Sequence, residues 1–370
     1  MGKCQICHVN HPLIGHNLGI CLNCIRTRPE QALQMANQIH TKTRVRFNLP
    51  PTPPNDENGL FCGVCANNCK IGIGKKGYCG LVENKESKLV RHAGTPEKGI
   101  LSWYYDSLPT NCVAWWFCPG CTGAGYPKYA YTAHVETGYY NLAVFYGSCS
   151  LDCLFCQNWH YRKHAARLQP IVSAQELAEK VDEKTSCICY FGGDPSTQMP
   201  HALKTSQLAV KKAEENKRIL RVCWETNGYM NPQLADQAAT LALKSGGNIK
   251  FDLKTWDENL NQALCGTSNQ PTIERFKEIG TKYYDKRAEL PVLTASTLLV
   301  PGYVDREEVE KIAQFIAEIN PEIPYTLLAF YPQYVMNDLP TTSRKQANEC
   351  LETAKNHLTN VRIGNIHLLS

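Results

Sequence analysis

The sequence lacks long apolar stretches and a strong charge of one sign. No apolar run among its 370 residues approaches the roughly 18 residues that a membrane-spanning helix needs. The opening MGKCQICHVN also lacks the apolar core of a signal peptide. The formal net charge of +5 is mild for this length and does not indicate a nucleic-acid-binding surface. We therefore expect a cytoplasmic protein with no membrane or nucleic-acid partner.

Cysteine, by contrast, is abundant. The chain has 19 cysteines, and most of them precede residue 157. In a reducing compartment, clustered cysteines are more often metal ligands than disulfides. Because 43% of the residues are hydrophobic, the chain can also bury a sizeable core, which argues against disorder. These features predict a folded, metal-rich protein, and iron–sulfur use on this scale would suit an anaerobic organism.

Composition divides the chain into three predicted parts. Residues 1–50 form a first unit that ends at the run NLPPTPPNDENG (Asn48–Gly59), because proline fixes φ and favours an extended residue before it. Residues 60–138 are rich in cysteine, glycine and aromatic residues and show little periodicity, as expected of a region held together by metals. In residues 139–370, short apolar runs alternate with helical patterns.

This third part predicts an α/β fold. Strands alternating with helices imply parallel βαβ units, and six in succession predict a partial (β/α)6 version of the TIM-like barrel. Reactive groups in such barrels gather at the carboxyl ends of the strands. The predicted strands are 139–147, 186–193, 218–226, 248–255, 294–302 and 323–332, and the predicted helices are 173–184, 204–216, 232–244, 272–281 and 305–319.

The loop after the first predicted strand holds three cysteines in the stretch YGSCSLDCLFCQNW. Cys149, Cys153 and Cys156 form a Cx3Cx2C pattern, so each thiol can reach a different iron of a 4Fe–4S cube. Such clusters normally take four cysteines, and three leave one iron open to another ligand. A structural zinc site with a distant fourth ligand is the alternative, but zinc sites usually combine two Cys/Cys or Cys/His pairs.

The Cx3Cx2C pattern, with Phe155 before its last cysteine, resembles the radical S-adenosylmethionine (SAM) superfamily. The resemblance implies that the amino and carboxylate groups of SAM chelate the open iron. It further implies that an electron from the reduced cluster cleaves SAM to methionine and a 5′-deoxyadenosyl radical. That radical then takes a hydrogen atom from the substrate.

Motifs after the later strands extend the resemblance. FGGDPS resembles the Gly-Gly-Glu motif that binds the SAM amino group, with Asp194 in place of glutamate. In WETNGY, Glu225 matches an acidic position that contacts the ribose in activating enzymes. Lys254 in FDLKTW matches a lysine near SAM, and LLVPGYVD lies where the backbone approaches the adenine. The implied cofactor-binding residues are Phe155, Gly192, Gly193, Asp194, Glu225, Asn227, Lys254 and Pro301.

Within the superfamily, the chain is similar to the pyruvate formate-lyase activating enzymes and to the AmmeMemoRadiSam-system enzymes. Phe61–Leu89 and Asn360–His367 resemble segments of the latter, so the resemblance covers roughly residues 60–370. One position departs from the pattern. Activating enzymes carry a histidine after the Pro-Tyr of the sixth strand, where this chain has Thr326. The role of that histidine is therefore not carried over.

Three further cysteine sets precede the predicted barrel. Cys4, Cys7, Cys21 and Cys24 form CxxC-x13-CxxC, which predicts a zinc-ribbon- or rubredoxin-like site for zinc or a single iron, with a structural or docking role. A second set and a third set predict either zinc or an auxiliary iron–sulfur cluster that passes electrons or binds substrate, and the third set could also complete a shared metal site. The second set is Cys62, Cys65, Cys69 and Cys79, and the third is Cys112, Cys118 and Cys121. The remaining five, Cys187, Cys189, Cys223, Cys265 and Cys350, are expected to be buried core thiols.

The similarity to activating enzymes implies a protein or peptide substrate and an electron donor such as a reductase, ferredoxin or flavodoxin. The expected reaction is hydrogen abstraction that leads to glycyl-radical formation or to carbon methylation. Methylation could depend on cobalamin, as in archaeal radical SAM enzymes that methylate a glutamine of methyl-coenzyme M reductase, although the usual Asp-x-His-x-x-Gly cobalamin motif is missing. The alternative is a non-enzymatic multi-metal electron carrier or zinc-ribbon interaction protein, which would need no SAM site.

Overall fold

The computed structural model describes residues 1–287 and 289–370, and its largest element is a nine-stranded sheet. Seven strands of this sheet run parallel and lie side by side in chain order. They are β8 (Tyr140–Tyr146), β10 (Thr185–Gly192), β11 (Arg221–Thr226), β12 (Ile249–Asp252), β13 (Leu293–Leu299), β14 (Tyr325–Ala329) and β15 (Val361–Gly364). Two antiparallel strands, β7 (Gly99–Ser107) and β9 (Ile171–Val172), extend it beyond β8. The order leaves β15 and β9 at the two edges, so the curved sheet is an open barrel.

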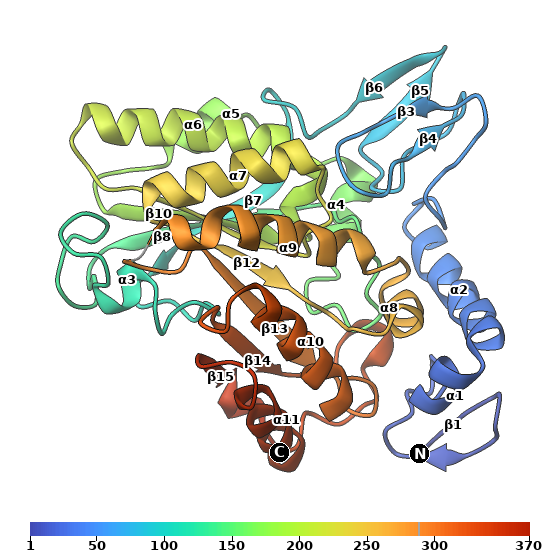
Figure 1. Cartoon of the computed structure of the whole chain (residues 1–370). Coiled ribbons are helices and arrows are strands. Elements are labelled where there is room, and N and C mark those ends of the chain that lie inside the picture. The colour runs from blue at the N-terminus through green and yellow to red at the C-terminus, as the bar shows by residue number, and fades with distance from the viewer. Residues whose placement is uncertain (288) are drawn as a thin grey trace.

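Helices cover the outer face of this sheet (Figure 1). Each parallel strand before β15 is followed by a connection that returns to the other end of the sheet, as parallel pairing requires. The helices of these connections are α4 (Tyr161–Arg167), α5 (Ala174–Glu179), α6 (Met199–Glu215), α7 (Pro232–Ser245), α8 (Glu258–Cys265), α9 (Gln270–Tyr283), α10 (Arg306–Ile319) and α11 (Arg344–Lys355).

The α/β prediction is confirmed, and all six predicted strands are present. The five predicted helices are present as well, with α5 shorter than the predicted 173–184. Ser173 caps α5 through the expected capping box with Glu176. The prediction omitted β7, β15 and several helices, among them α8 and α11. None of the helices in the described part of the chain is both long and apolar enough to cross a membrane.

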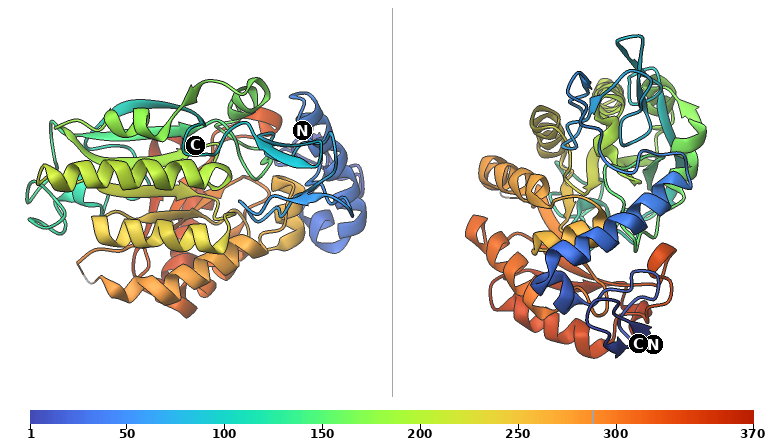
Figure 2. Two further views of the ribbon diagram at one scale, coloured as in Figure 1. Left: turned by 90° about the horizontal axis from the view of Figure 1, so that it is seen from above. Right: turned by 90° about the vertical axis from the view of Figure 1, so that its right-hand side faces the viewer.

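Apart from β7, the elements of the first 138 residues lie at the two ends of the barrel. The hairpin β1–β2 (Gly2–Lys3 and Asn10–His11) and helices α1 (Leu22–Thr27) and α2 (Pro29–Val45) lie on the same side of the molecule as the paired strands β3–β4 (Leu60–Phe61 and Lys70–Ile71) and β5–β6 (Val82–Lys85 and Lys88–Arg91) (Figures 1 and 2). The short helix α3 (Pro119–Thr122) lies at the opposite end of the sheet. The cysteine sets before the barrel are therefore divided between its two ends.

Side-chain alternation along the strands separates two layers of the interior. Tyr146, Tyr190 and Trp224 are fully buried and face the outer helices, where the Trp224 indole donates to the Ala238 carbonyl of α7. Their neighbours Phe191 and Glu225 face the inside of the barrel, where they line its cavities. The inner layer therefore carries the polar and sulfur-containing side chains.

Candidate active site

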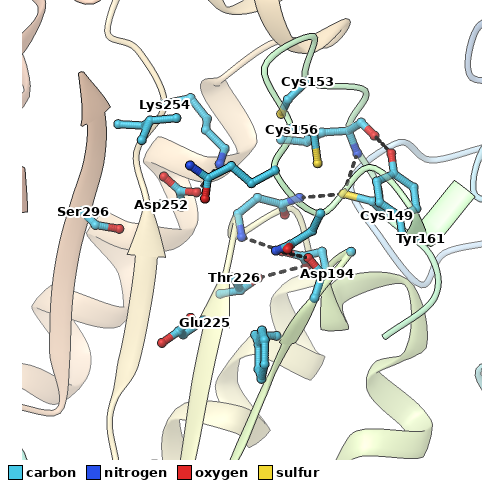
Figure 3. Close-up of a pocket in the computed structure, with 18 of the residues that line it drawn as sticks. Cys149, Cys153, Cys156, Tyr161, Asp194, Glu225, Thr226, Asp252, Lys254 and Ser296 are labelled. Carbon is cyan, nitrogen blue, oxygen red and sulfur yellow. Dashed lines mark hydrogen bonds and ion pairs between the residues drawn. The ribbon is translucent and has the colours of Figure 1, made fainter. Parts of the chain in front are cut away.

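The three cysteines of the Cx3Cx2C pattern lie together on the loop after β8 (Figure 3). They face a cavity of about 200 Å³ at the carboxyl ends of the parallel strands. Helix α8 holds this loop in place, because Asp152 N donates to the Cys265 carbonyl (2.9 Å) and Leu154 N donates to the Leu264 carbonyl (2.8 Å). The Tyr161 hydroxyl donates to the Leu151 carbonyl from the other side (2.9 Å). The loop conformation is thus fixed by the protein itself.

The chemistry of the three thiols fits a metal cluster. Burial raises the pKa of Cys149 and Cys156, so their thiolates need a cationic partner. For Cys153, a hydrogen bond from the Cys265 thiol lowers the pKa and favours the thiolate. The Asn227 amide also approaches the sulfur of Cys149 (3.6 Å). Three thiols facing one cavity match the ligand set of a 4Fe–4S cluster with one open iron.

The glycine pair at the end of β10, Gly192 and Gly193, allows the cysteine loop to approach closely. Gly192 has a φ of +107°, a conformation that favours glycine, and a Cβ on Gly193 would lie 2.2 Å from the Ser148 carbonyl oxygen. Instead, Gly193 N donates to the Tyr146 carbonyl and Asp194 N to the Ser148 carbonyl, both at 2.8 Å. These two hydrogen bonds therefore join the loop after β10 to the loop that carries the three cysteines, which we call the cluster loop.

Asp194 is buried and has several protein partners. Its Oδ2 accepts from Asn227 N (2.6 Å), and its Oδ1 accepts from Ser196 N (2.8 Å) and the Thr226 hydroxyl (3.1 Å). Burial raises the pKa of this carboxyl, and these hydrogen bonds oppose that shift. Asp194 thus ties the loop after β10 to the loop after β11, and the contact to SAM that the resemblance implies stays a prediction.

Charged side chains from the next strands form the opposite wall. Glu225 Oε1 lies 2.8 Å from Nζ of Lys250, and the Lys254 ammonium pairs with Asp252. Burial acts to lower the pKa of Lys254, but the Asp252 carboxylate outweighs it and the pKa is raised. Among the described residues, no group hydrogen-bonds the buried Oδ1 of Asp252, so the cavity holds an acceptor oxygen ready for a ligand's donor.

The cavity unites most of the predicted cofactor-binding residues. Its wall includes Phe155, Gly192, Gly193, Asp194, Glu225, Asn227 and Lys254. Pro301 does not belong to this wall, and its predicted role near the adenine stays a prediction. Lys250, Asp252 and Ser296 also line the cavity and were not among the predicted residues. The alternation of Lys250, Asp252 and Lys254 along the β12 region was the signal that could have found the first two.

The sulfur atoms of the first N-terminal set lie close together. Those of Cys4, Cys7, Cys21 and Cys24 are all within 4.8 Å of one another. Hydrogen bonds within the set lower the pKa of Cys4 to about 6, although burial acts in the opposite direction. Four thiols at this spacing suit the tetrahedral coordination of zinc or a single iron.

The second set lies beside the cluster loop. The Ser148 hydroxyl donates to the Cys79 carbonyl (3.1 Å), and the Asn67 amide donates to the Ser150 carbonyl (2.7 Å). Burial raises the pKa of Cys65, Cys69 and Cys79. The third set, by contrast, lies in the segment that reaches the amino end of the barrel, around α3. The second set therefore lies near the carboxyl ends of the parallel strands, and the third lies at their amino ends.

An open parallel barrel with three thiols at the mouth of a polar cavity defines an iron–sulfur protein of the α/β class. Comparison with known proteins specifies the family: residues 143–316, from β8 to α10, match the Radical SAM superfamily model. The chain therefore contains a radical SAM domain, which implies a 4Fe–4S cluster and SAM as cofactors. The resemblance predicted from the motifs is confirmed.

Individual relatives are distant. An uncharacterized protein of Methanocaldococcus jannaschii is 25% identical over 327 residues, which cover 84% of this chain and 83% of that protein. Another protein of that organism, named provisionally as a glycyl-radical enzyme activating enzyme, is 27% identical over 190 residues, or 49% of this chain and 64% of that protein. A solved domain of a pyruvate-formate lyase-activating enzyme from Bacteroides vulgatus is 17% identical, with a TM-score of 0.38 over 48% of this chain and 98% of that chain.

Proposed function

We propose that this protein is a radical SAM enzyme that takes a hydrogen atom from a protein or peptide substrate as the first step of a post-translational modification. The observation that carries the proposal is the convergence of Cys149, Cys153 and Cys156 with the Gly192–Asp194 loop on one cavity. An electron carrier would need the cysteines alone. The charged wall opposite the cysteines, which includes Glu225, Asp252 and Lys254, has no role in an electron carrier but suits a polar ligand such as SAM.

The cluster and SAM, when bound, supply a 5′-deoxyadenosyl radical. The protein's own residues bind SAM and limit the access of water. Lys254 and Asp252 offer a paired ammonium and carboxylate to the polar groups of SAM, and Glu225 offers a carboxylate to its hydroxyl groups. Buried Phe155 and half-buried Phe191 cover part of the wall with carbon and limit the access of water, which would otherwise weaken these polar contacts.

The proposed substrate class rests on relatives. The second relative above is named as an activating enzyme for glycyl-radical enzymes, which are proteins. A low-potential donor such as a ferredoxin, a flavodoxin or a reductase would supply the electron. Glycyl-radical formation and carbon methylation both begin with the same hydrogen transfer, and cobalamin would be needed only for the second. The metal roles of the three N-terminal cysteine sets belong to the same proposal.

The test uses anaerobically purified, reconstituted protein incubated with SAM and a one-electron reductant. We expect 5′-deoxyadenosine from the wild-type chain and none above background from a C149A/C153A/C156A variant. C350A is the control, because Cys350 is also a buried cysteine but lies on α11 and does not line the cavity, and the variant should retain full activity. Deoxyadenosine from the triple variant, or none from a wild-type sample with an intact cluster, would refute the proposal. Cobalamin copurifying with the protein would specify methylation.

A further inference from the structure

A second cavity lies inside the barrel, nearer the amino ends of the strands. It measures about 130 Å³, and its wall includes Asn141, Arg221 and Asn248, which lie at or before the starts of their strands. Phe191, Glu225 and Lys250 belong to the walls of both cavities. A group bound in the second cavity would therefore lie next to the SAM site.

Thiols line this second cavity from two sides, and we call it the thiol chamber. On the sheet side, Cys189 of β10 stands opposite Cys223 of β11 in the strand register, and Cys187 shares their face because side chains alternate. On the other side, Cys112 and Cys118 come from the segment before α3. The sequence patterns predicted core thiols at the three strand positions. The structure directs them toward the inside of the barrel instead of toward the outer helices.

The segment that carries Cys112 and Cys118 is fastened across the open side of the barrel. The Trp116 indole donates to the Thr326 hydroxyl on β14 (3.3 Å), and Thr326 in turn donates to the Val113 carbonyl (3.2 Å). The guanidinium of Arg362 on β15 lies 4.8 Å from the Trp116 ring centre. Thr326, at the position where activating enzymes have a histidine, thus holds the second wall of the chamber.

A buried ammonium group sits among the thiols. Lys250, only 3% exposed, places its Nζ 3.0 Å from the sulfur of Cys112 and 3.3 Å from that of Cys189. The Cys112 and Cys189 thiols therefore both face this ammonium group. Metal ligation removes their protons, and a positive charge at the wall then stabilises the resulting thiolates. Lys250 supplies that charge from the wall of the chamber, where it also pairs with Glu225 (2.8 Å).

Free thiols are chemically unsuited to a chamber beside the SAM site, and this step rests on the proposed function. An S–H bond is weaker than the C–H bonds of a substrate, so a primary carbon radical formed nearby would take hydrogen from a thiol first. Ligation to a metal removes the S–H hydrogen. The spacing also matters: among the described residues, only the first N-terminal set has all its sulfurs within 4.8 Å, which leaves the chamber thiols too widely spaced for one ion.

We propose that the thiol chamber binds an auxiliary iron–sulfur cluster, with Cys112 and Cys118 as ligands from one wall and Cys189 and Cys223 from the other. Cys187 is left out because a 4Fe–4S cluster takes four thiolates and Cys187 lies two residues before Cys189, nearer the amino end of β10. Loading with a preformed [4Fe–4S]²⁺ cluster replaces each of these S–H bonds with an Fe–S bond and releases one proton per thiol. No electron is transferred in this step.

The test starts from the C149A/C153A/C156A chain, which lacks the SAM-cleaving cluster, so the outcome is independent of SAM cleavage. After anaerobic reconstitution with iron and sulfide, we compare iron, acid-labile sulfide and the electron paramagnetic resonance (EPR) signal of the reduced protein. Adding either C112A/C118A or C189A/C223A to this triple variant should remove the iron, the sulfide and the EPR signal of one cluster per chain. Adding C350A should remove none. Circular dichroism verifies that each variant is folded.

Crystallography gives a second measurement that needs no substitution in the thiol chamber itself. An anomalous difference map at the iron absorption edge, from a crystal of the reconstituted C149A/C153A/C156A protein, should show a peak in the thiol chamber among its four proposed ligands. A chamber without an iron peak in a crystal that shows iron or zinc at other cysteine sets would overturn the proposal. So would chamber variants that keep all the iron and sulfide of their background.

Discussion

Cys265 shows how a residue outside the Cx3Cx2C pattern contributes to the cluster site. Its side chain is fully buried at the end of α8, and its thiol interacts directly with the sulfur of Cys153. Its backbone carbonyl accepts the hydrogen bond of Asp152 N from the cluster loop. One cysteine therefore both fixes the loop and donates to a cluster ligand.

We predict that Cys265→Ala makes the reduction potential of the SAM-cleaving cluster more negative. A hydrogen bond to a ligand sulfur stabilises the reduced, more negative cluster, so its loss disfavours reduction. An EPR-monitored redox titration of the reconstituted protein measures the shift, with C350A as the buried-cysteine control. A potential equal to that of the wild type would show that the Cys265 thiol does not act on the cluster.

Single residues also mark the limit of prediction from the sequence. The motif residues could be found because each follows a strand and resembles a known pattern. For Lys250, the alternation with Asp252 and Lys254 indicates only the face of the strand that it shares with them, and nothing in the stretch NIKFD indicates that it is buried against Cys112 and Glu225. Its partners come from segments far apart in the chain, and only the folded sheet brings them together.

At the scale of elements, the central strands were predictable and the edges were not. Inner strands such as β10 are buried on both faces and read as continuous apolar runs. The edge strand β15, VRIG, has four residues with an exposed arginine, which is too short and polar for such a pattern. The strand β7 is buried over its first three residues and mostly exposed after them, so it has no regular alternation, and it lies in a region that its cysteines and glycines made look irregular.

The contact of helix α6 with the sheet gives a prediction on pH. His201 of α6 is buried, its Nε2 donates to the Val172 carbonyl of β9 (3.0 Å), and its Nδ1 therefore accepts from the Tyr146 hydroxyl of β8 (2.8 Å). Burial lowers the pKa of His201 from 6.5 to about 4. Below pH 6.5 the unfolded chain binds the proton more readily, so stability is complete above that pH and is lost as the pH falls toward 4.

This shift corresponds to about 3 kcal/mol of unfolding free energy between pH 6.5 and 4. His201→Gln removes the titrating group, so the variant should be less stable than the wild type at pH 7.5, and the difference should shrink as the pH falls. Urea denaturation at a series of pH values measures it. Two stability curves that stay parallel over this range would contradict the assignment.

At the scale of the whole molecule, one buried carboxylate joins the N-terminal region to the cluster loop. Asp152 lies between Cys149 and Cys153 and is fully buried. It accepts from His40 (2.9 Å) and Thr43 (2.8 Å) of α2 and from Nε of Arg162 (3.0 Å) on α4. These partners hold the pKa of Asp152 well below its usual range, because their charges and hydrogen bonds outweigh burial. The helix α2 and the cluster loop therefore depend on the same side chain.

We predict that Asp152→Asn lowers the free energy of unfolding by about 3–5 kcal/mol, because it leaves the buried Arg162 without its anionic partner. Asp236→Asn is the matched control, since it breaks an exposed pair with Lys282 and should cost less than about 1 kcal/mol. Urea denaturation measures both. Because Asp152 stands between two of the cluster cysteines, the variant should also bind less iron on reconstitution at temperatures where it remains folded. Full stability with full iron content would mean that the N-terminal region and the cluster loop are held together by other contacts.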